Sequence, residues 1–165
     1  VPPRGAIRAA QQMLSIPVVG PAQASMQLAA LLGTRFATIT SDPRWIPQME
    51  AYISEVGMRE HAIMHKPMRA VALAPDVFFG CLGGDYQPAV DAFCEVAAGC
   101  IQDGADVLIV GCGLLSPMLT TAGLHIMDGV PVIDPMLVSL KYAEMLIDYR
   151  RAGLPTKATA GLLLT

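Results

Sequence analysis

Residues 104–118 read Gly104-Ala105-Asp106-Val107-Leu108-Ile109-Val110-Gly111-Cys112-Gly113-Leu114-Leu115-Ser116-Pro117-Met118, and this stretch decides the fold. The apolar run after Asp106 is too short and too rich in β-branched residues for a helix, so it predicts a buried parallel strand. The small residues Gly111–Gly113 follow, where the backbone can turn sharply. Ser116 predicts a helix N-cap, and Pro117 fits the first position of that helix.

The Cys112 thiol is therefore expected at the carboxyl end of a strand, facing the N-terminus of the next helix. Unpaired amides and the positive end of the helix dipole favour anions there, including a thiolate. This arrangement is typical of a reactive cysteine. The alternative is that Cys112 only fills a tight turn, because free cysteines are usually buried and inert. The stretch alone leaves both interpretations open.

The composition indicates a folded protein that can bury a substantial core. The chain has 165 residues, of which 53% are apolar and only 15% charged. This length suits one ordinary domain, or one lobe and part of another. The net charge of −3 is mild and no basic cluster is present, which argues against nucleic acid as a partner.

A second compositional question is whether the chain enters a membrane. Residues 107–127 carry no formal charge, but Gly111, Gly113, Pro117 and Gly123 interrupt them, so strand, turn and helix explain the run better than a membrane span. The chain opens Val-Pro-Pro-Arg, with no signal peptide and no initiator Met. We therefore expect a cytoplasmic protein without a membrane partner, and a chain that lacks its natural N-terminus.

The other cysteines show no metal-ligand spacing. Cys94 and Cys100 fall on the apolar stripe of a helix predicted over 87–103, and we expect both in the core. Cys81 falls on a glycine-rich loop. His61 and His65 are four residues apart, but their surroundings favour strand or loop over a helix that could hold a metal. The sequence supports neither a disulfide framework nor a metal site.

Strands and helices alternate along the chain, which predicts a parallel sheet covered on both sides. Helices are predicted at Arg4–Leu14, Ala22–Leu32, Pro43–Val56, 87–103, from Ser116, and Met136–Arg151. Strands are predicted at Ile16–Val19, Arg35–Thr40, within His61–Ala74, after Asp106, and at Pro131–Ile133, with a loop at Asp76–Tyr86. In such sheets ligands bind beyond the carboxyl ends of strands, where the turns at Thr40-Ser41 and Cys112 carry the chemically useful side chains.

The sequence also contains a weak internal repeat. The segment 16–21 and its helix align with the segment 130–135 and its helix at a constant offset of 114 residues. Applied to Cys112, this offset points to a position just ahead of Val1. We therefore expect one complete lobe together with the tail of a related lobe, and an equivalent of Cys112 upstream of Val1.

Taken together, these segments resemble the aspartate/glutamate/hydantoin racemase superfamily, most of all its hydantoin and allantoin racemase branch. The pieces that carry the resemblance are Ile16-Pro17-Val18-Val19-Gly20-Pro21, Thr38-Ile39-Thr40-Ser41, Gly104-Ala105-Asp106 with Gly111-Cys112-Gly113, Val130-Pro131-Val132-Ile133-Asp134, and Gly153-Leu154-Pro155-Thr156-Lys157. The resemblance implies two pseudo-symmetric α/β lobes with open parallel sheets. Residues 34–134 would form the second lobe, and 1–33 with 135–165 the remainder of an incomplete first lobe.

The resemblance also implies a reaction and a set of site residues. Each lobe gives one cysteine to a cleft, and no cofactor is used. One cysteine removes the proton from a stereogenic carbon as a thiolate, and the other returns a proton to the opposite face as a thiol. Cys112 matches the second-lobe cysteine. Thr40 and Ser41 match the turn that anchors substrate, with Ser41 in place of a commoner threonine. The carbanion places charge on a carbonyl oxygen, which the amides of Gly113 and Leu114 would stabilise.

The sequence analysis thus favours a cofactor-independent racemase lobe, in a homo-oligomer, that acts on a hydantoin, allantoin or amino-acid derivative. A nearly neutral ring suits the scarcity of Lys and Arg near these turns, whereas a dicarboxylate would need more cationic help. A decarboxylase or cis-trans isomerase of the same superfamily is the first alternative. A non-catalytic domain that binds small molecules, with an inert Cys112, is the second.

Overall fold

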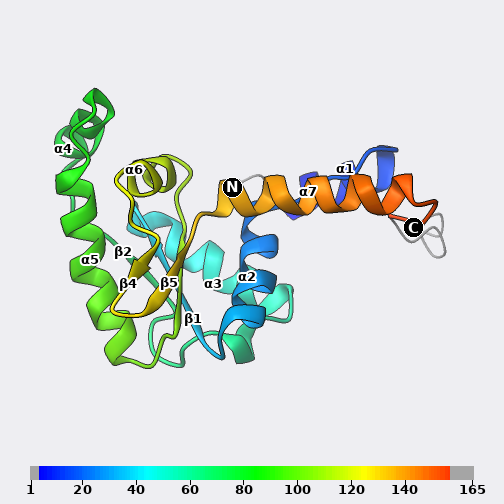
Figure 1. Cartoon of the computed structure of the whole chain (residues 1–165). Helices are drawn as coiled ribbons and strands as arrows, with labels where there is room; N and C mark the ends of the chain where they lie inside the picture. The colour runs from blue at the N-terminus through cyan, green and yellow to red at the C-terminus, as the bar shows by residue number, and fades with distance from the viewer. Residues whose placement is uncertain (1–3, 157–165) are drawn as a thin grey trace.

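The structure, a computed structural model that describes residues 4–156, is built around one five-stranded sheet (Figure 1). The strands are β1 (Phe36–Thr40), β2 (Met68–Ala70), β3 (Val107–Val110), β4 (Ile126–Met127) and β5 (Val130–Ile133). Their order in the sheet is β2-β1-β3-β5-β4. All neighbours run parallel except β4, which is antiparallel to β5. The predicted α/β class with a mostly parallel sheet is confirmed.

Helices cover both faces of this sheet (Figure 1). The α-helices are α1 (Arg4–Met13), α2 (Pro21–Leu32), α3 (Ile46–Glu55), α4 (Pro75–Gly80), α5 (Gln87–Gln102), α6 (Leu115–Thr121) and α7 (Pro135–Arg151). Short 3₁₀ helices are η1 (Pro43–Trp45), η2 (Arg59–His61) and η3 (Cys81–Gly83). The predicted helices at 4–14, 22–32, 87–103 and 136–151 are present, each with a shift of one residue at one end, and the one predicted at 43–56 is η1 followed by α3.

Two hydrophobic cores lie on opposite faces of the sheet because successive strand residues point to opposite sides. Phe36, Val107 and Ile109 pack with α2 and α3 on one face. Ala37 and Ile39 pack with α5 and α6 on the other. The central strand β3 is buried along its whole length, as its apolar run predicts.

Asp106 fixes the start of the central strand against its neighbour. Its carboxylate accepts hydrogen bonds from the backbone amides of Thr34, at 2.8 Å, and Arg35, also at 2.8 Å. Gly33 passes so close that a Cβ there would lie 2.5 Å from Asp106 Oδ1. This clamp holds the register in which Phe36 pairs with Val107.

The strand predicted at Ile16–Val19 is wrong. The segment is irregular, and within residues 4–156 no strand lies beside it to complete a ladder. Pro17 has no amide hydrogen to give to such a ladder. The Val18 carbonyl instead accepts a hydrogen bond from Gln11 Nε2 at 3.1 Å. Of the two segments in the internal repeat, only 130–133 forms a strand.

The loop predicted at Asp76–Tyr86 is also wrong, because α4 and η3 occupy most of it. Pro75 starts α4, and Phe78 anchors the helix in the core. Cys81 is buried in η3, where its thiol donates to the Val77 carbonyl at 3.3 Å. Tertiary packing here outweighs a local composition rich in glycine.

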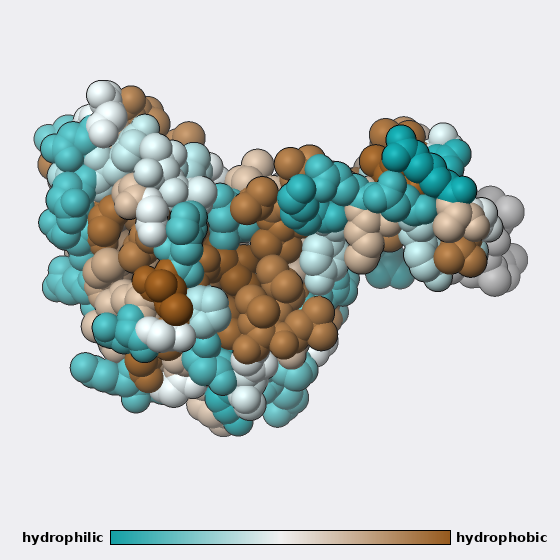
Figure 2. Space-filling view, viewed as in Figure 1, coloured by the Kyte–Doolittle hydropathy of each residue, from teal (hydrophilic) through white to brown (hydrophobic). Residues whose placement is uncertain are grey.

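Helix α7 leaves the sheet and extends away from the body of the molecule (Figure 1), and its far end contacts the segment that follows α1. The Arg150 side chain donates to the Ser15 carbonyl, which links the two segments. Figure 2 shows an apolar surface over α2 and the start of α7. These two helices carry exposed apolar side chains, among them Leu31, Met136 and Leu140. Among the described residues, no helix combines the length and the hydropathy needed to cross a membrane. Lys157, from the last matching motif, and residues 1–3 lie outside the described part of the chain.

Candidate active site

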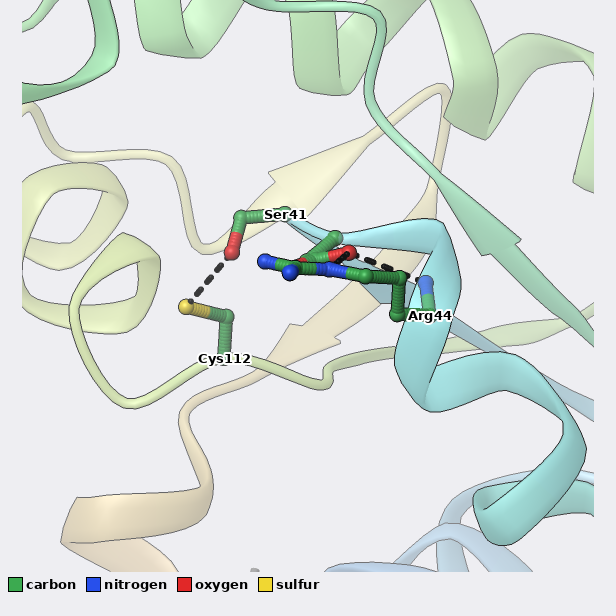
Figure 3. Close-up of polar contacts among 4 residues, drawn as sticks. Ser41, Arg44 and Cys112 are labelled. Atoms are coloured by element: carbon green, nitrogen blue, oxygen red, sulfur yellow. Dashed lines mark hydrogen bonds and ion pairs between the residues drawn. The ribbon is translucent and has the colours of Figure 1, made fainter. Parts of the chain in front are cut away.

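Cys112 lies just beyond β3, at the carboxyl edge of the sheet, where the sequence predicts it. Ser41 lies just beyond the neighbouring strand β1. The Ser41 hydroxyl donates a hydrogen bond to the Cys112 sulfur across an Oγ–Sγ distance of 3.0 Å (Figure 3). Both residues are half-buried. Two turns that are 71 positions apart in the sequence thus meet at one pair of side chains.

The backbone around Cys112 is tightly constrained. A Cβ at Gly111 would lie 2.8 Å from Thr38 Cγ2 and 3.3 Å from the Ile39 carbonyl oxygen, so a side chain there would force β1 to move. The Gly111 amide donates to that same carbonyl at 2.7 Å. This contact holds the Cys112 turn against the end of β1.

The helix after Cys112 begins two residues earlier than the predicted cap and first position. The Cys112 carbonyl accepts a hydrogen bond from the Ser116 amide at 3.0 Å, and α6 starts at Leu115. Ser116 is therefore inside the first turn and buried, not an N-cap, and Pro117 takes the third position instead of the first. The Ser116 hydroxyl makes no well-formed hydrogen bond of its own. Leu114 holds the cap position, without a side-chain cap bond.

The remaining predicted site residues lie close by in different environments. Thr40 ends β1 with only 1% of its surface exposed. Gly113 and Leu114 form the exposed turn between Cys112 and α6. The structure therefore places all five predicted residues at one edge of the sheet. Among the described hydrogen bonds, that of Ser41 joins one of these residues directly to the Cys112 thiol.

A cavity of about 260 Å³ opens beside Cys112 on the face of the sheet covered by α2 and α3. Its lining includes Cys112 with Met26, Thr38, Gln48, Met49, Tyr52, Ile109, Gly111, Gly113 and Met136. The sequence did not predict that the α3 residues Gln48, Met49 and Tyr52, or Met136 of α7, would line the site. Apolar periodicity shows which face of a helix is buried, but not that the helix covers the end of a particular strand.

Apart from Cys112, the polar side chains that line this cavity carry no charge at neutral pH. Burial raises the pKa of the Tyr52 phenol, and the nearby negative charge of Glu55 raises it further. The lining otherwise consists mainly of apolar groups and the amide of Gln48. The cavity therefore suits a small, largely uncharged molecule.

Two carboxylates near this edge act as helix caps. Asp42 accepts from the Arg44 amide at 2.9 Å and pairs with the Arg44 guanidinium, and the side-chain and amide bonds of Arg44 lower the pKa of Asp42. Asp134 caps α7 through the Met136 and Leu137 amides. Both carboxylates are therefore occupied as N-caps, of η1 and of α7.

The environment of Asp134 favours its charged form. Burial raises the pKa of this carboxyl, but nearby hydroxyls and amides outweigh burial and lower it overall. The Thr120 hydroxyl donates at 2.7 Å, and the Ser116 hydroxyl is near enough to contribute. Neither Asp42 nor Asp134 is therefore a good proton acceptor at neutral pH.

The three other cysteines lie away from the cavity lining. Cys100 is fully buried, and burial raises the pKa of its thiol to about 11. Burial, followed by the charges of Asp91 and Asp128, raises the pKa of Cys94. Cys94 is only half-buried, so the prediction that it belongs to the core is wrong. The core face of α5 is taken by Phe93, its neighbour in sequence.

The histidine pair offers no shared helix face. His61 ends the short helix η2, and His65 lies in the irregular segment that follows. Over the described range 4–156, no three His, Cys, Asp or Glu side chains gather as metal ligands would.

The chain belongs to the Asp/Glu/hydantoin racemase family. The model of that family matches residues 5–143, most of the chain. The matched range includes the Cys112 turn, the Thr40-Ser41 turn and all the residues that line the cavity beside Cys112.

The named relatives of this chain are hydantoin racemases. The chain is 32% identical over 142 residues to a hydantoin racemase of Rhizobium meliloti, covering 86% of this chain and 55% of that protein. It is 27% identical to a hydantoin racemase of Pseudomonas sp. strain NS671, covering 86% of this chain and 54% of that one. The chain thus spans about half the length of these curated relatives.

Solved structures show the same fold. The allantoin racemase from Pseudomonas fluorescens superimposes with a TM-score of 0.72 at 25% identity, covering 94% of this chain and 62% of that one. The allantoin racemase from Klebsiella pneumoniae gives a TM-score of 0.71 at 23% identity, covering 96% and 60%. The racemase-type α/β fold expected from the sequence is therefore shown.

Proposed function

We propose that this chain supplies one catalytic half of a cofactor-independent racemase that acts on a hydantoin, an allantoin or a related amino-acid derivative. The observation that carries the proposal is the position of Cys112, which follows the central strand, bonds to Ser41 and borders the cavity. Family membership supplies the reaction class, and the relatives' names supply the substrate classes.

The proposed step is proton transfer between sulfur and carbon. As a thiolate, Cys112 takes the proton from the stereogenic carbon, and the electron pair of the broken C–H bond moves onto the adjacent carbonyl as an enolate. The amides of Gly113 and Leu114 stabilise the enolate oxygen, and the resemblance to racemases assigns the turn at Thr40 and Ser41 to holding the ring. A second acid on the opposite face returns a proton, which inverts the carbon.

The second acid comes, in this proposal, from another lobe. Residues 34–134 form the second lobe, and 1–33 with 135–165 belong to the first, whose cysteine is supplied from upstream of Val1. The lining of the cavity supports this arrangement. Ile7 of α1, Pro21 of α2 and Met136 of α7, which are assigned to the first lobe, line the cavity together with Cys112 of the second.

The character of the cavity supports a neutral cyclic substrate over a dicarboxylate. Its lining is mainly apolar, and Arg44, the nearest cation in sequence to either turn, is already paired with Asp42. A decarboxylase or cis-trans isomerase of the same superfamily would use the same thiol without a partner cysteine. A binding domain would leave Cys112 chemically inert.

Replacing Cys112 tests the proposal directly. In the protein that includes the upstream half, Cys112→Ser is expected to abolish racemisation of a 5-substituted hydantoin, because a serine hydroxyl is far too weak an acid to ionise at neutral pH. Polarimetry follows the reaction, and circular dichroism checks that the fold is kept. The matched control is Cys94→Ser, which removes a thiol outside the cavity and leaves racemisation intact. A Cys112→Ser protein that still racemises would refute the assignment.

Reactivity separates the enzyme from the binding domain. On brief exposure to iodoacetamide at pH 7, mass spectrometry is expected to find Cys112 alkylated before Cys94 and Cys100, whose thiols are held neutral by raised pKa values. Earlier labelling of either helix cysteine would favour the inert interpretation.

A further inference from the structure

We propose that Ser41 is a positioning residue for Cys112, which stabilises its thiolate and fixes the direction of its sulfur, instead of a residue that anchors substrate. The resemblance to racemases implies the anchoring role for this turn. The structure shows the Ser41 hydroxyl already bonded to the sulfur at 3.0 Å. The catalytic meaning of this inference rests on the proposed function, but its physical content is tested without substrate.

The geometry that brings the two side chains together is part of the sheet. Strands β1 and β3 are neighbours, with Ile39 paired to Val110. The bond from the Gly111 amide to the Ile39 carbonyl ties the ends of the two strands together. Ser41 and Cys112 leave these ends on the same edge, and Figure 3 shows their side chains pointing toward each other. The contact therefore does not depend on a flexible loop.

A hydroxyl suits both protonation states of a cysteine that exchanges protons with carbon. It donates to the thiolate, and by rotating it accepts from the thiol. A hydrogen bond to a charged acceptor is stronger than one to a neutral acceptor, so the pair favours the thiolate. The same bond restricts rotation of the sulfur, which keeps it at the border of the cavity.

The charged groups around the thiol are engaged elsewhere. On the Ser41 turn, Asp42 and Arg44 bind each other. At the start of α7, Asp134 accepts from Thr120 and two backbone amides. Helix α6 and the first turns of α2 and α7 carry no charged residue. Among the described contacts of Cys112, the Ser41 hydroxyl is thus the side-chain partner available to an anion.

The experiment measures the alkylation rate of Cys112 by iodoacetamide as a function of pH, in the 165-residue chain, with the product resolved by mass spectrometry. Ser41→Ala is expected to move the midpoint of the rate profile up by about one pH unit, which is an about tenfold slower reaction at pH 7. Ser41→Thr keeps a hydroxyl and is expected to restore the original midpoint. Circular dichroism verifies that each variant is folded.

Two control variants test whether the effect belongs to this hydroxyl. Ser116→Ala removes a buried hydroxyl four residues from Cys112 that has no well-formed bond, and its midpoint is expected to stay unchanged. Arg44→Gln removes the cation of the Ser41 turn while leaving the hydroxyl, and its midpoint shift is expected to be much smaller than that of Ser41→Ala. A larger shift in Arg44→Gln would show that the cation governs the thiolate and would overturn the proposal.

An unchanged midpoint in folded Ser41→Ala would also overturn the positioning proposal and would favour a substrate-anchoring role for Ser41. In the protein with its upstream half, the positioning role predicts that Ser41→Ala lowers kcat more than it raises KM, whereas anchoring predicts the reverse. The two proposals fail separately. If Ser41→Ala shifts the midpoint but Cys112→Ser still racemises the substrate fully, the proposed function is refuted and the effect of Ser41 on the thiol is retained.

Discussion

Asp106 is the single side chain that most clearly links the sequence to the sheet. It precedes the central strand, and its carboxylate accepts the amides of Thr34 and Arg35 ahead of β1. Burial raises the pKa of this carboxyl, but the amide bonds from Thr34 and Arg35 outweigh burial and lower it overall. The charged form therefore stabilises the folded chain.

Replacing Asp106 tests this clamp. Asp106→Asn is expected to lower the free energy of unfolding at pH 7 by about 1 kcal/mol, a modest value because the residue is exposed. Since the folded pKa lies below the unfolded value of about 3.9, the contribution is complete above that value and is lost as the pH falls through the folded pKa. Urea unfolding at pH 7 and pH 3 should show the difference between wild type and variant shrinking.

The control for this prediction is Asp148→Asn, which breaks only an exposed pair with Arg151 on α7. Its effect is expected to stay within about 0.5 kcal/mol at pH 7. A difference between Asp106→Asn and wild type that persists unchanged at low pH would show that packing, not charge, carries the clamp.

At the site, the sequence predicts the positions of Ser41 and Cys112 but not their contact. Both follow short apolar strands, so both are expected at a carboxyl edge. Their contact requires that β1 and β3 be neighbours, which the order of elements along the chain does not determine. For Ser116, the local sequence pattern gives the wrong role. The pattern is that of an N-cap, but the Ser116 amide donates to the Cys112 carbonyl, so the residue lies buried inside the first turn of α6.

At the scale of elements, the β4–β5 hairpin was not predicted, although its turn has a clear signal. Asp128 and Gly129 separate the strands and both have positive φ, of 49° and 83°. Two consecutive residues with positive φ form the type I′ turn that Asp-Gly favours in hairpins. Strand β5 is predicted at Pro131–Ile133, but β4 has only two residues and shows no apolar pattern, so the Asp-Gly dipeptide is the sign of the hairpin.

A substitution in this turn gives a measurable consequence. Gly129→Ala is expected to destabilise the fold by about 1–2 kcal/mol, because alanine in the left-handed conformation is strained even though no atom lies within 4 Å of the new Cβ. Thermal and urea unfolding measure the loss.

Gly80→Ala is the matched control for the turn substitution. It also adds a methyl group in open space, but at the end of α4 with an ordinary helical backbone. Alanine is expected to be neutral there or to stabilise by up to about 1 kcal/mol. Equal effects of the two substitutions would contradict the backbone explanation.

At the scale of the whole molecule, the α/β class and the alternation of elements could be predicted because buried parallel strands have an unmistakable apolar pattern. The placement of α3 over the cavity and the departure of α7 from the body could not. Both depend on contacts between segments far apart in the sequence, such as those that bring Gln48 and Met136 to Cys112.

The two-lobe proposal makes a prediction for the 165-residue chain itself. Inversion needs a base on one face of the carbon and an acid on the other, and the other thiols lie away from the cavity. The chain alone is therefore expected to show no racemisation of a hydantoin by polarimetry, whereas a protein extended through the upstream half is expected to show it. A lone thiolate could at most exchange the proton for deuterium with retention. Racemisation by residues 1–165 alone would contradict the two-lobe arrangement.

The borders of the sheet have a consequence for how copies of this chain meet one another. Strand β2 at one border has three residues, and β4 at the other has two. Each border therefore offers few unpaired backbone groups to a second chain, which disfavours the edge-to-edge stacking that leads to amyloid. Self-association at high concentration should instead proceed through side chains such as Leu31 and Leu140 and be reversed by mild detergent.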